Sequence, residues 1–423
     1  MISRREDMIR KILIASAGFF LVLISWNNNS IWADEAFTLN LTQMNFRDAM
    51  TAAISDAVHP PLYYFLLMGF QRITMAVPVS VIVRSKLFSA IWIILALAQG
   101  SRMIQQKYGS RKAILFLSLA MGMQVIRYGV EIRMYSLAMY TTLIAALYAD
   151  RIEDSDSRKN WGMLTLYSVL SCYSHYFSIL VLIPIWLMLL YEEVKKKNLK
   201  TWLIGAAAVV ICFLPWLSAV SGSLSSVPED RYPITIGRIL HALVYPYSVH
   251  NKLVTAFVCI ITVSLALISF FRKDEKKIPR VLILNPLFLL GMGILLSVLV
   301  GKFFDGKYLL PGWIAFLAGI SISAPEKCAA KRALTAALVV LNAISYVCIY
   351  QYEEEDRKGY QELMRLEKEK LSYPEGAREL GYYGIQNESA SCTYRLSFSE
   401  DTEGTYLETI QIGGMSYQVY QCR

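Results

Sequence analysis

Long apolar runs, separated by short polar loops, dominate the chain. Eleven of these runs have, or nearly have, the roughly 20 mostly apolar residues that crossing a membrane requires. The pattern predicts an all-α polytopic membrane protein with about eleven transmembrane helices. The expected spans lie near 11–27, 84–101, 113–127, 134–150, 161–175, 177–191, 201–220, 253–271, 281–300, 309–323 and 333–350.

Composition agrees with this pattern. The chain has 423 residues, of which 55% are hydrophobic and 18% charged, and its mean hydropathy is +0.40. Soluble proteins average about 45–50% apolar and about 25% charged residues, so this chain is more apolar and less charged than they are. Its composition also differs from that of disordered, collagen-like and disulfide-dense secreted chains, and these classes are excluded. In a soluble protein the net charge of +9 would suggest nucleic acid as a partner. Here the cations are expected to hold loops on the cytoplasmic side of a lipid bilayer, with no nucleic acid bound.

The basic residues also set the predicted topology. Residues 61–77 are apolar enough to cross the membrane, but a crossing there would invert every later basic loop. If this segment instead lies at the interface, 23 of the 42 Lys and Arg residues fall in the N-terminal tail and in loops on its side. The positive-inside rule then places the N-terminus in the cytoplasm and makes the chain a multi-pass protein of the plasma membrane. The segment 61–77 is accordingly expected to be an interfacial helix of the first outer loop.

The composition changes after residue 350. Residues 351–423 carry 14 acidic and 8 basic side chains, which leaves +15 on the membrane body. We therefore divide the chain into a transmembrane domain, 1–350, and an extracytoplasmic C-terminal tail or small α+β domain, 351–423. A helix over 353–371 and strands in TYLETIQI and MSYQVY are expected there.

Two cysteines fall in this tail, Cys392 and Cys422. The predicted topology puts them in an oxidising space, where two cysteines of a small domain can pair. Sequence gives no distance between them, so bonded and free cysteines both remain open. The other five cysteines are expected to be packing residues.

Charged side chains within or beside a membrane span are energetically costly unless they have a partner or a function. Two clusters of charged or ionisable residues lie beside the expected spans early in the chain. Asp34 and Glu35 follow the first span. They suit either a solvated helix start or a catalytic site, because acidic residues favour the first turn of a helix. His59 precedes Pro60-Pro61 and the aromatic Tyr63, which suits either a helix cap at the interface or a binding site.

Two further clusters fall on the same predicted outer face. The short loop around Arg133 and Tyr135 is positively charged against the topological trend; a structural Glu131–Arg133 pair or a bound anion would both account for it. Lys307 and Tyr308 stand at the mouth of another span, and His175 lies in a hairpin between two short spans. Carboxylates, histidines and cations on one membrane face suit a lipid-borne anionic substrate, whose phosphate the cations would hold.

Six short motifs give these clusters a family resemblance. They are, in chain order, WADEAFTL, HPPLYYFLL, IRYGVEIRMYSLA, SHYFSILVL, FLPWL and KYLLPGW. In order and spacing they resemble the membrane-embedded C-type (GT-C) glycosyltransferases, particularly bacterial members akin to protein O-mannosyltransferases, aminoarabinose transferases and Rgt-type transferases. The resemblance covers most of residues 8–325.

The resemblance implies roles for individual residues. Asp34 occupies the position of the catalytic base, and Glu35 that of a supporting or acceptor-orienting neighbour. His59 and Arg133 fall where relatives bind the donor phosphate, as do Lys307 and Tyr308, although Lys307 stands where Arg is more usual. Lysine keeps the charge but cannot bind phosphate through two parallel hydrogen bonds. Tyr63, Tyr135 and His175 are the expected substrate-binding residues.

The implied activity is transfer of a sugar from a polyprenyl-phosphate donor to an acceptor hydroxyl on the outer face, with inversion. No metal or other cofactor is required by this chemistry, although a divalent metal remains open, and the sequence does not identify the sugar or the acceptor. A transporter or flippase of a lipid-linked saccharide is the alternative, and a structural or assembly subunit is a third class. The segment 221–252, with Glu229, Asp230 and Arg231, is expected to contribute to specificity.

Overall fold

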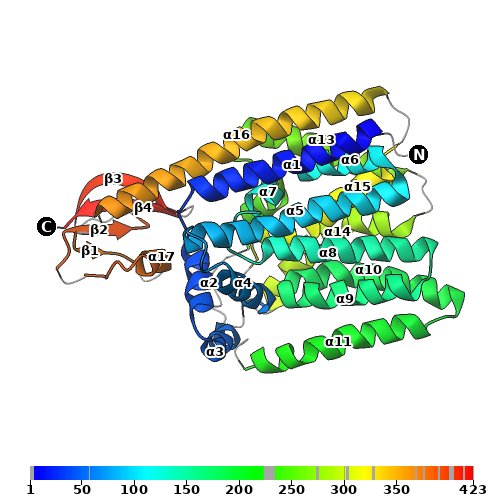
Figure 1. The fold of residues 1–423 in the computed structure, drawn as a ribbon, viewed down its shortest axis with the longest axis horizontal. Coiled ribbons are helices and arrows are strands. Elements are labelled where there is room, and N and C mark those ends of the chain that lie inside the picture. Colours follow the sequence, from blue (N-terminus) through cyan, green and yellow to red (C-terminus); the bar gives the residue numbers. More distant parts are fainter. Residues whose placement is uncertain are drawn as a thin grey trace.

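The computed structural model describes residues 4–56, 58–222, 234–272, 276–299, 301, 304–325, 329–366, 369–374, 377–388, 391–399, 404–412 and 415–422, with only the backbone described for 329–333. Long helices running side by side form the body of the molecule, and a small sheet lies beyond one end of it (Figure 1). We call that end of the helical body the site end. The N-terminus lies at the other end.

Each of the eleven segments expected to span the membrane contains a helix, so the polytopic helical class is confirmed. Within the described part of the chain, seven helices have the length and hydropathy of a membrane span: α1, α5, α10, α11, α13, α14 and α16. The other four segments hold α6, α8, α9 and α15, so eleven crossings remain a prediction. The bounds are α1 Arg4–Asn27, α5 Val81–Tyr108, α6 Ser110–Ala120, α8 Tyr135–Asp154, α9 Arg158–Ser174, α10 Tyr176–Lys196, α11 Lys200–Val220, α13 Lys252–Phe271, α14 Lys277–Leu299, α15 Leu310–Ser323 and α16 Ala329–Leu366.

Close packing explains why the short helix α15 can be buried. Its residues from Leu310 to Ser323 are all buried. At Gly312 a Cβ atom would lie 2.8 Å from the Leu289 side chain on α14 and 3.0 Å from that of Val181 on α10. The missing side chain therefore lets three helices approach closely, as small residues do in membrane bundles.

Short helices gather at the site end. They are α2 Ala33–Gln43, α3 Phe46–Asp56, α4 Leu62–Ile73, α7 Met123–Arg127, α12 Ile236–Val244 and the 3₁₀ turns η2 Tyr245–Tyr247 and η3 Gly306–Leu309. Helix α2 runs across the ends of the long helices (Figure 1). Helix α4 has 12 residues, or about 18 Å at 1.5 Å per residue, which is too short to cross about 30 Å of hydrocarbon. The segment 61–77 therefore does not hold a spanning helix.

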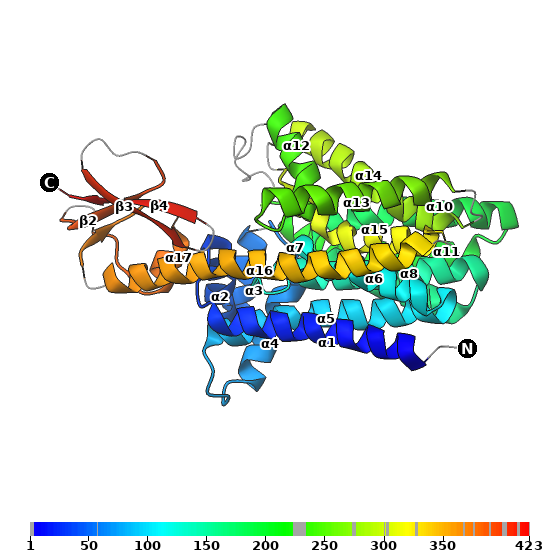
Figure 2. The same ribbon diagram turned by 90° about the horizontal axis from the view of Figure 1, so that it is seen from above.

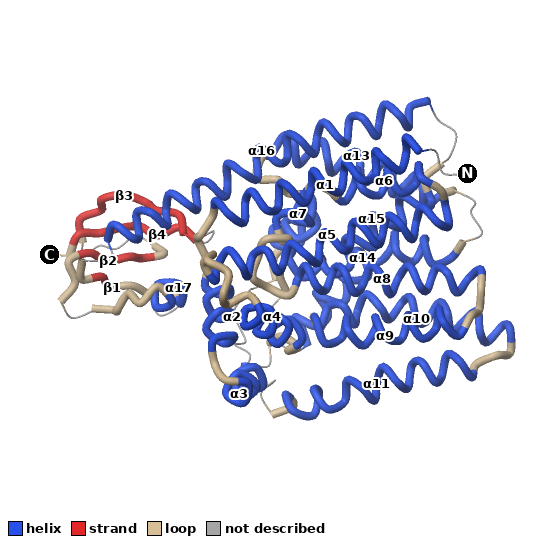
Figure 3. The backbone as a smooth tube through the Cα atoms, viewed as in Figure 1, coloured by secondary structure: helices blue, strands red, loops and turns tan. Residues whose placement is uncertain are grey.

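Helix α16 continues for 38 residues without a break from the bundle to the sheet, as Figure 2 shows. The separate helix expected over 353–371 is therefore the end of α16. Four strands follow, β1 Leu371–Ser372, β2 Tyr394–Ser397, β3 Thr405–Ile412 and β4 Met415–Gln421, with the short helix α17 Arg378–Tyr382 between β1 and β2. Figure 3 shows that the strands are confined to this end of the molecule. We call residues 369–422 the appendage.

The sheet of the appendage has the order β1-β2-β4-β3, with β1 parallel to β2 and the other pairs antiparallel. Strands β3 and β4 form at the two segments where alternating apolar residues predict them. Their inward side chains build a separate small core with the end of α16 and with α17: Leu363, Leu366, Leu371, Ala377, Leu380, Ile385, Leu396, Ile410, Ile412, Tyr417 and Val419.

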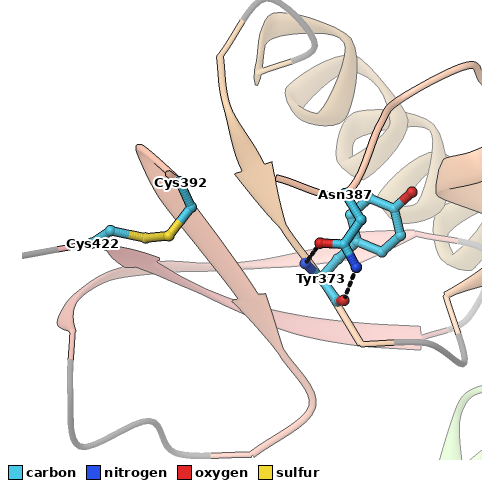
Figure 4. Close-up of a disulfide and its surroundings, with 4 residues drawn as sticks. All are labelled: Tyr373, Asn387, Cys392 and Cys422. Carbon is cyan, nitrogen blue, oxygen red and sulfur yellow. Dashed lines mark hydrogen bonds between the residues drawn. A yellow bond between two sulfur atoms is a disulfide. The ribbon is translucent and has the colours of Figure 1, made fainter. Parts of the chain in front are cut away.

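A disulfide closes the appendage. Cys392 and Cys422 are bonded, with their Cα atoms 6.1 Å apart, which decides the alternative that sequence left open (Figure 4). On the neighbouring loop, the Asn387 side chain accepts a hydrogen bond from the Tyr373 amide and donates one to its carbonyl. The disulfide joins the segment before β2 to the end of β4, and the amide pair joins the segments on either side of α17.

Candidate active site

Asp34 lies in the first turn of α2, between two cations. Its carboxylate oxygen Oδ2 is 3.6 Å from Lys307 Nζ and 3.9 Å from an Arg133 guanidinium nitrogen. The side chain is 26% exposed, so it remains open to a ligand. Three segments far apart in the sequence thus bring together the charged residues that the sequence assigns to one site.

Arg133 is the buried cation of this group. It comes from the loop between α7 and α8 and donates hydrogen bonds to the Asp34 carbonyl oxygen (3.0 Å) and to Thr38 Oγ1 (2.9 Å). Although burial opposes its charge, Tyr64 and Asp34 raise the pKa of Arg133 above its usual range. A fixed positive charge therefore faces Asp34 at every physiological pH.

Lys307 is supplied by η3. Asp305 caps this turn by accepting the Lys307 amide at 3.0 Å, and Gly306 lets the turn approach α12. The Lys307 ammonium lies 4.7 Å from the centre of the Trp32 ring. It is therefore held between a carboxylate and an aromatic face.

Four aromatic or imidazole rings pack together beside Arg133 and Lys307. His175 lies between α9 and α10, with ring centres 5.7 Å from His59, 5.3 Å from Tyr135 and 5.8 Å from Tyr308. The imidazole Nδ1 accepts a hydrogen bond from the Phe177 amide at 3.1 Å. Burial, with Arg133 and Lys307 nearby, lowers the pKa of His175 to about 3, so the ring is neutral.

Two polar atoms in this ring cluster are buried without a hydrogen-bond partner among the described residues: His175 Nε2 and the Tyr135 hydroxyl. An unsatisfied buried polar group is costly, and a bound ligand is one way of satisfying it. These two atoms, together with the two cations, can bind an anionic ligand next to the Asp34 carboxylate. The structure thus brings together seven of the predicted site residues: Asp34, His59, Arg133, Tyr135, His175, Lys307 and Tyr308.

Glu35 is placed differently from its neighbour. It is buried, and its carboxylate accepts the Ile132 amide at 2.7 Å and the Trp32 amide at 3.2 Å. Burial, and then the nearby Glu131, raise the pKa of the Glu35 carboxyl. These contacts join the start of α2 to the loop that carries Arg133, so the geometry gives Glu35 a positioning role.

Tyr63 also points away from the cations. It is fully buried, and its hydroxyl is 2.6 Å from the Ser89 hydroxyl on α5. Its neighbour Tyr64 is the one whose pKa depends chiefly, after burial, on Arg133, Asp56 and Asp34. Tyr63 thus bonds Ser89 through its hydroxyl, and its role in substrate binding stays a prediction.

Of the two alternatives for the charged loop around Arg133, a structural Glu131–Arg133 pair is not the one that forms. Glu131 pairs instead with Arg127, at 2.6 Å, and accepts a hydrogen bond from the Trp32 indole at 2.6 Å. Arg133 turns toward Thr38 and Asp34 because its loop bends after Ile132, whose amide is held by Glu35.

Sequence reasoning missed Thr38, Tyr64 and Asp56. Asp56 ends α3, and burial raises the pKa of its carboxyl in opposition to Arg133. Thr38 lies one turn after Asp34, which is a helical spacing that sequence does show. The segment expected to contribute to specificity lies partly outside the described residues, since Glu229, Asp230 and Arg231 are not among them.

No group of three or more His, Cys, Asp or Glu side chains within the described ranges is arranged to hold a metal ion. The charge available to balance an anion here comes from Arg133 and Lys307. The site therefore offers one accessible carboxylate and fixed positive charge within 4 Å of it.

Comparisons with known proteins show a sequence likeness over part of the chain and a likeness in fold over most of it. The family described as dolichyl-phosphate-mannose-protein mannosyltransferase matches residues 58–218. ArnT from Cupriavidus metallidurans in the apo state is similar in fold, with a TM-score of 0.59 and 9% identity over 88% of this chain and 83% of that one. No curated protein sequence matches the chain.

A second solved structure, ArnT from Cupriavidus metallidurans bound to undecaprenyl phosphate, has a TM-score of 0.55 and 10% identity over 84% of this chain and 71% of that one. At such identity the likeness concerns the fold, and the matched family concerns residues that include His59, Arg133 and His175. Residues 58–218 thus match this mannosyltransferase family, and most of the chain shares the fold of the two ArnT structures.

Proposed function

We propose that the protein transfers a sugar from a polyprenyl-phosphate donor to an acceptor hydroxyl at the outer face of the plasma membrane. The observation that carries the proposal is the Asp34 carboxylate within 4 Å of both Arg133 and Lys307. A base and an anion-binding pair in contact are what displacement of a phosphate leaving group requires. The solved relative that binds undecaprenyl phosphate supports the choice of donor.

In this mechanism Asp34 takes the proton of the acceptor hydroxyl. The acceptor oxygen attacks the anomeric carbon while the bond from that carbon to the phosphate oxygen breaks. The electron pair of the broken bond stays on the phosphate, so the products are the glycosylated acceptor, polyprenyl phosphate and a proton on Asp34. Attack opposite the leaving group inverts the anomeric centre.

Arg133 and Lys307 neutralise the charge that develops on the leaving phosphate. Each well-placed donor of this kind commonly contributes about 3 kcal/mol to lowering the barrier. His175 is neutral, so it serves as a hydrogen-bonding group rather than as a third charge, and His59 and the hydroxyl groups of Tyr135 and Tyr308 complete the polar lining. The scheme needs no metal, because side chains balance the phosphate.

The variant Asp34→Asn tests the role of Asp34 as the catalytic base, and the experiment does not require the sugar to be known. The gene is deleted in its host, and lipid-linked sugars and surface glycans are analysed by mass spectrometry before and after complementation. Wild type and the exposed control Asp48→Asn are expected to restore the glycan and clear the accumulated polyprenyl-phosphate sugar. General-base catalysis contributes roughly 10²–10⁴-fold, so Asp34→Asn should leave the donor accumulated. Full restoration by Asp34→Asn at equal expression would refute the role of Asp34.

The same deletion strain, together with purified protein in proteoliposomes, distinguishes sugar transfer from flipping of the lipid. Loss of a flippase would leave its lipid-linked cargo intact on the cytoplasmic side, and purified protein would equilibrate the lipid without cleaving it. Release of free polyprenyl phosphate by protein in proteoliposomes, together with an equal amount of glycosylated acceptor, supports transfer. Equilibration of the lipid without bond cleavage would contradict it.

A further inference from the structure

Trp32 lies between the two parts of the site that carry charge. It is the residue immediately before α2, and its half-buried ring has the Lys307 ammonium 4.7 Å from its centre. Lys307 is in turn 3.6 Å from the Asp34 carboxylate. Trp32 is therefore the aromatic surface on which the accessible cation of the site rests.

The indole ring is itself fixed from the other side. Trp32 Nε1 donates a 2.6 Å hydrogen bond to Glu131, which pairs with Arg127 at 2.6 Å. Arg127 lies 3.7 Å from Glu353, a residue of α16, and Asn28 at the site end of α1 donates to the same carboxylate at 2.5 Å. A continuous set of buried polar contacts thus runs from α16 to the face of Trp32.

Physical chemistry explains why such a support is useful. A lysine side chain has four rotatable bonds and loses much conformational freedom when its ammonium is held in one place. An arginine, by contrast, carries a rigid planar group. A ring face of tryptophan attracts an ammonium ion through its quadrupole and restricts where that ion can lie. A rigidly held aromatic ring therefore lowers the conformational entropy that the flexible lysine loses when its ammonium binds a ligand.

We infer that Trp32 is a positioning residue, held by the Glu131–Arg127–Glu353 contacts, which orients Lys307 to bind the phosphate of a polyprenyl-phosphate lipid. The inference rests on the proposed function for the identity of that lipid. It assigns to Trp32 an effect that passes through Lys307 rather than through contact with the reacting atoms. It also gives the C-terminal helix α16 a part in setting the geometry of the site.

A double-mutant cycle in lipid binding tests this dependence. Binding of undecaprenyl phosphate, and of uncharged undecaprenol, is measured for Trp32→Leu, Lys307→Met and the double variant in nanodiscs. A desolvated cation–π contact supports an expected loss of roughly 10-fold for Trp32→Leu toward the phosphate lipid, and little change toward undecaprenol. Because Trp32 acts through Lys307, the double variant should bind no more weakly than Lys307→Met alone. Independent, additive losses, or an equal loss for undecaprenol, would overturn the inference.

Conservative variants separate positioning from folding. Trp32→Phe keeps a ring face but loses the indole hydrogen bond to Glu131, and Glu131→Leu loses the same bond from the other side. Both should lower the affinity for undecaprenyl phosphate by less than Trp32→Leu does, and only when Lys307 is present. Trp26→Leu, an exposed tryptophan on α1, is the matched control and should bind as wild type does. If Trp32→Phe loses as much affinity as Trp32→Leu at unchanged melting temperature, the aromatic rest is not what matters.

The binding assay and the transfer assay fail separately. Wild-type protein that binds undecaprenyl phosphate with the expected cycle but transfers no sugar in the complemented host would refute the proposed function and leave the role of Trp32 standing. Transfer by wild type together with additive losses in the cycle would leave the function standing and refute the role of Trp32.

Discussion

The guanidinium group of Arg133 contacts both the backbone carbonyl and the side-chain carboxylate of Asp34. One guanidinium nitrogen donates to the Asp34 carbonyl oxygen at 3.0 Å, and another lies 3.9 Å from the carboxylate. The first contact fixes the turn of α2 on which Asp34 stands, and the second places a charge beside the proposed base. The loop after α7 therefore both orients Asp34 and places a positive charge beside its carboxylate.

Arg133→Lys is expected to reduce sugar transfer by roughly 10²-fold. A lysine lacks the second guanidinium nitrogen, which faces the Asp34 carboxylate while the first bonds the Asp34 carbonyl and Thr38. Transfer rates in proteoliposomes measure the loss. Arg72→Lys, at an exposed arginine near the end of α4, is the matched control. Wild-type rates for Arg133→Lys would show that charge alone suffices at this position.

Gly306→Ala should displace Lys307 without removing any charge. A Cβ atom at Gly306 would lie 2.7 Å from Tyr245 Cβ and 3.1 Å from the backbone of Ala242, so η3 must move away from α12. Because small misplacements of reacting groups are costly, a loss of transfer of at least about 10-fold is expected. Gly69→Ala, where the added atom meets nothing within 4 Å, is the control. Equal activity of the two variants would mean that the contact with α12 does not position Lys307.

Removal of the disulfide should weaken the appendage more than the bundle. Cys392 and Cys422 are 30 residues apart, and opening a loop of that size costs about 3–4 kcal/mol in the chain-entropy model. Hydrogen exchange of the β2 and β4 amides in Cys392→Ser should therefore accelerate, while exchange in the long helices stays as it is. Cys212→Ser, at an exposed free cysteine, serves as the control. Unchanged exchange in β4 would show that the sheet does not depend on the bond.

The helical class and the apolar segments could be predicted because a bilayer requires long apolar runs, and those are visible in any sequence. The continuity of α16 could not. Its apolar half ends near Tyr350, and the charged residues 353–358 that follow favour a separate helix. In the structure β3 packs on the helix there, where a Cβ on Gly359 would collide with the Gln411 backbone. A tertiary contact, absent from local sequence, thus explains the glycine within the helix.

The membership of the site was partly predictable, because topology alone collects polar residues on one face. The direction of each side chain was not. Successive residues of a helix point about 100° apart, so Asp34 and Glu35, or Tyr63 and Tyr64, cannot share one environment. Sequence reasoning gave the neighbours Asp34 and Glu35 a common site, and only the fold separates the exposed carboxylate from the buried one.

The appendage should become less stable as the pH rises. Helix α17 packs against α2, and its buried Glu379 bonds the Tyr417 hydroxyl of β4. Burial, with a contribution from Asp34, raises the pKa of the Glu379 carboxyl to about 7 from 4.5. The folded state therefore binds this proton more tightly than the unfolded state does. Stability is fully present below about pH 4.5 and is lost as the pH rises through 7, by about 3 kcal/mol in total.

Glu379→Gln keeps the shape and the hydrogen bond without the titration, and should make stability of the appendage independent of pH between 5 and 8. Hydrogen exchange of the β4 amides at several pH values measures this, after correction for the intrinsic exchange rate. Glu369→Gln, an exposed position before β1, should keep the wild-type slope. A wild-type slope that survives in Glu379→Gln would assign the pH dependence to another group. Because α17 contacts α2, the helix that carries Asp34, the same titration should loosen the packing of α2. Sugar transfer by wild type should therefore fall more steeply between pH 5 and 8 than transfer by Glu379→Gln.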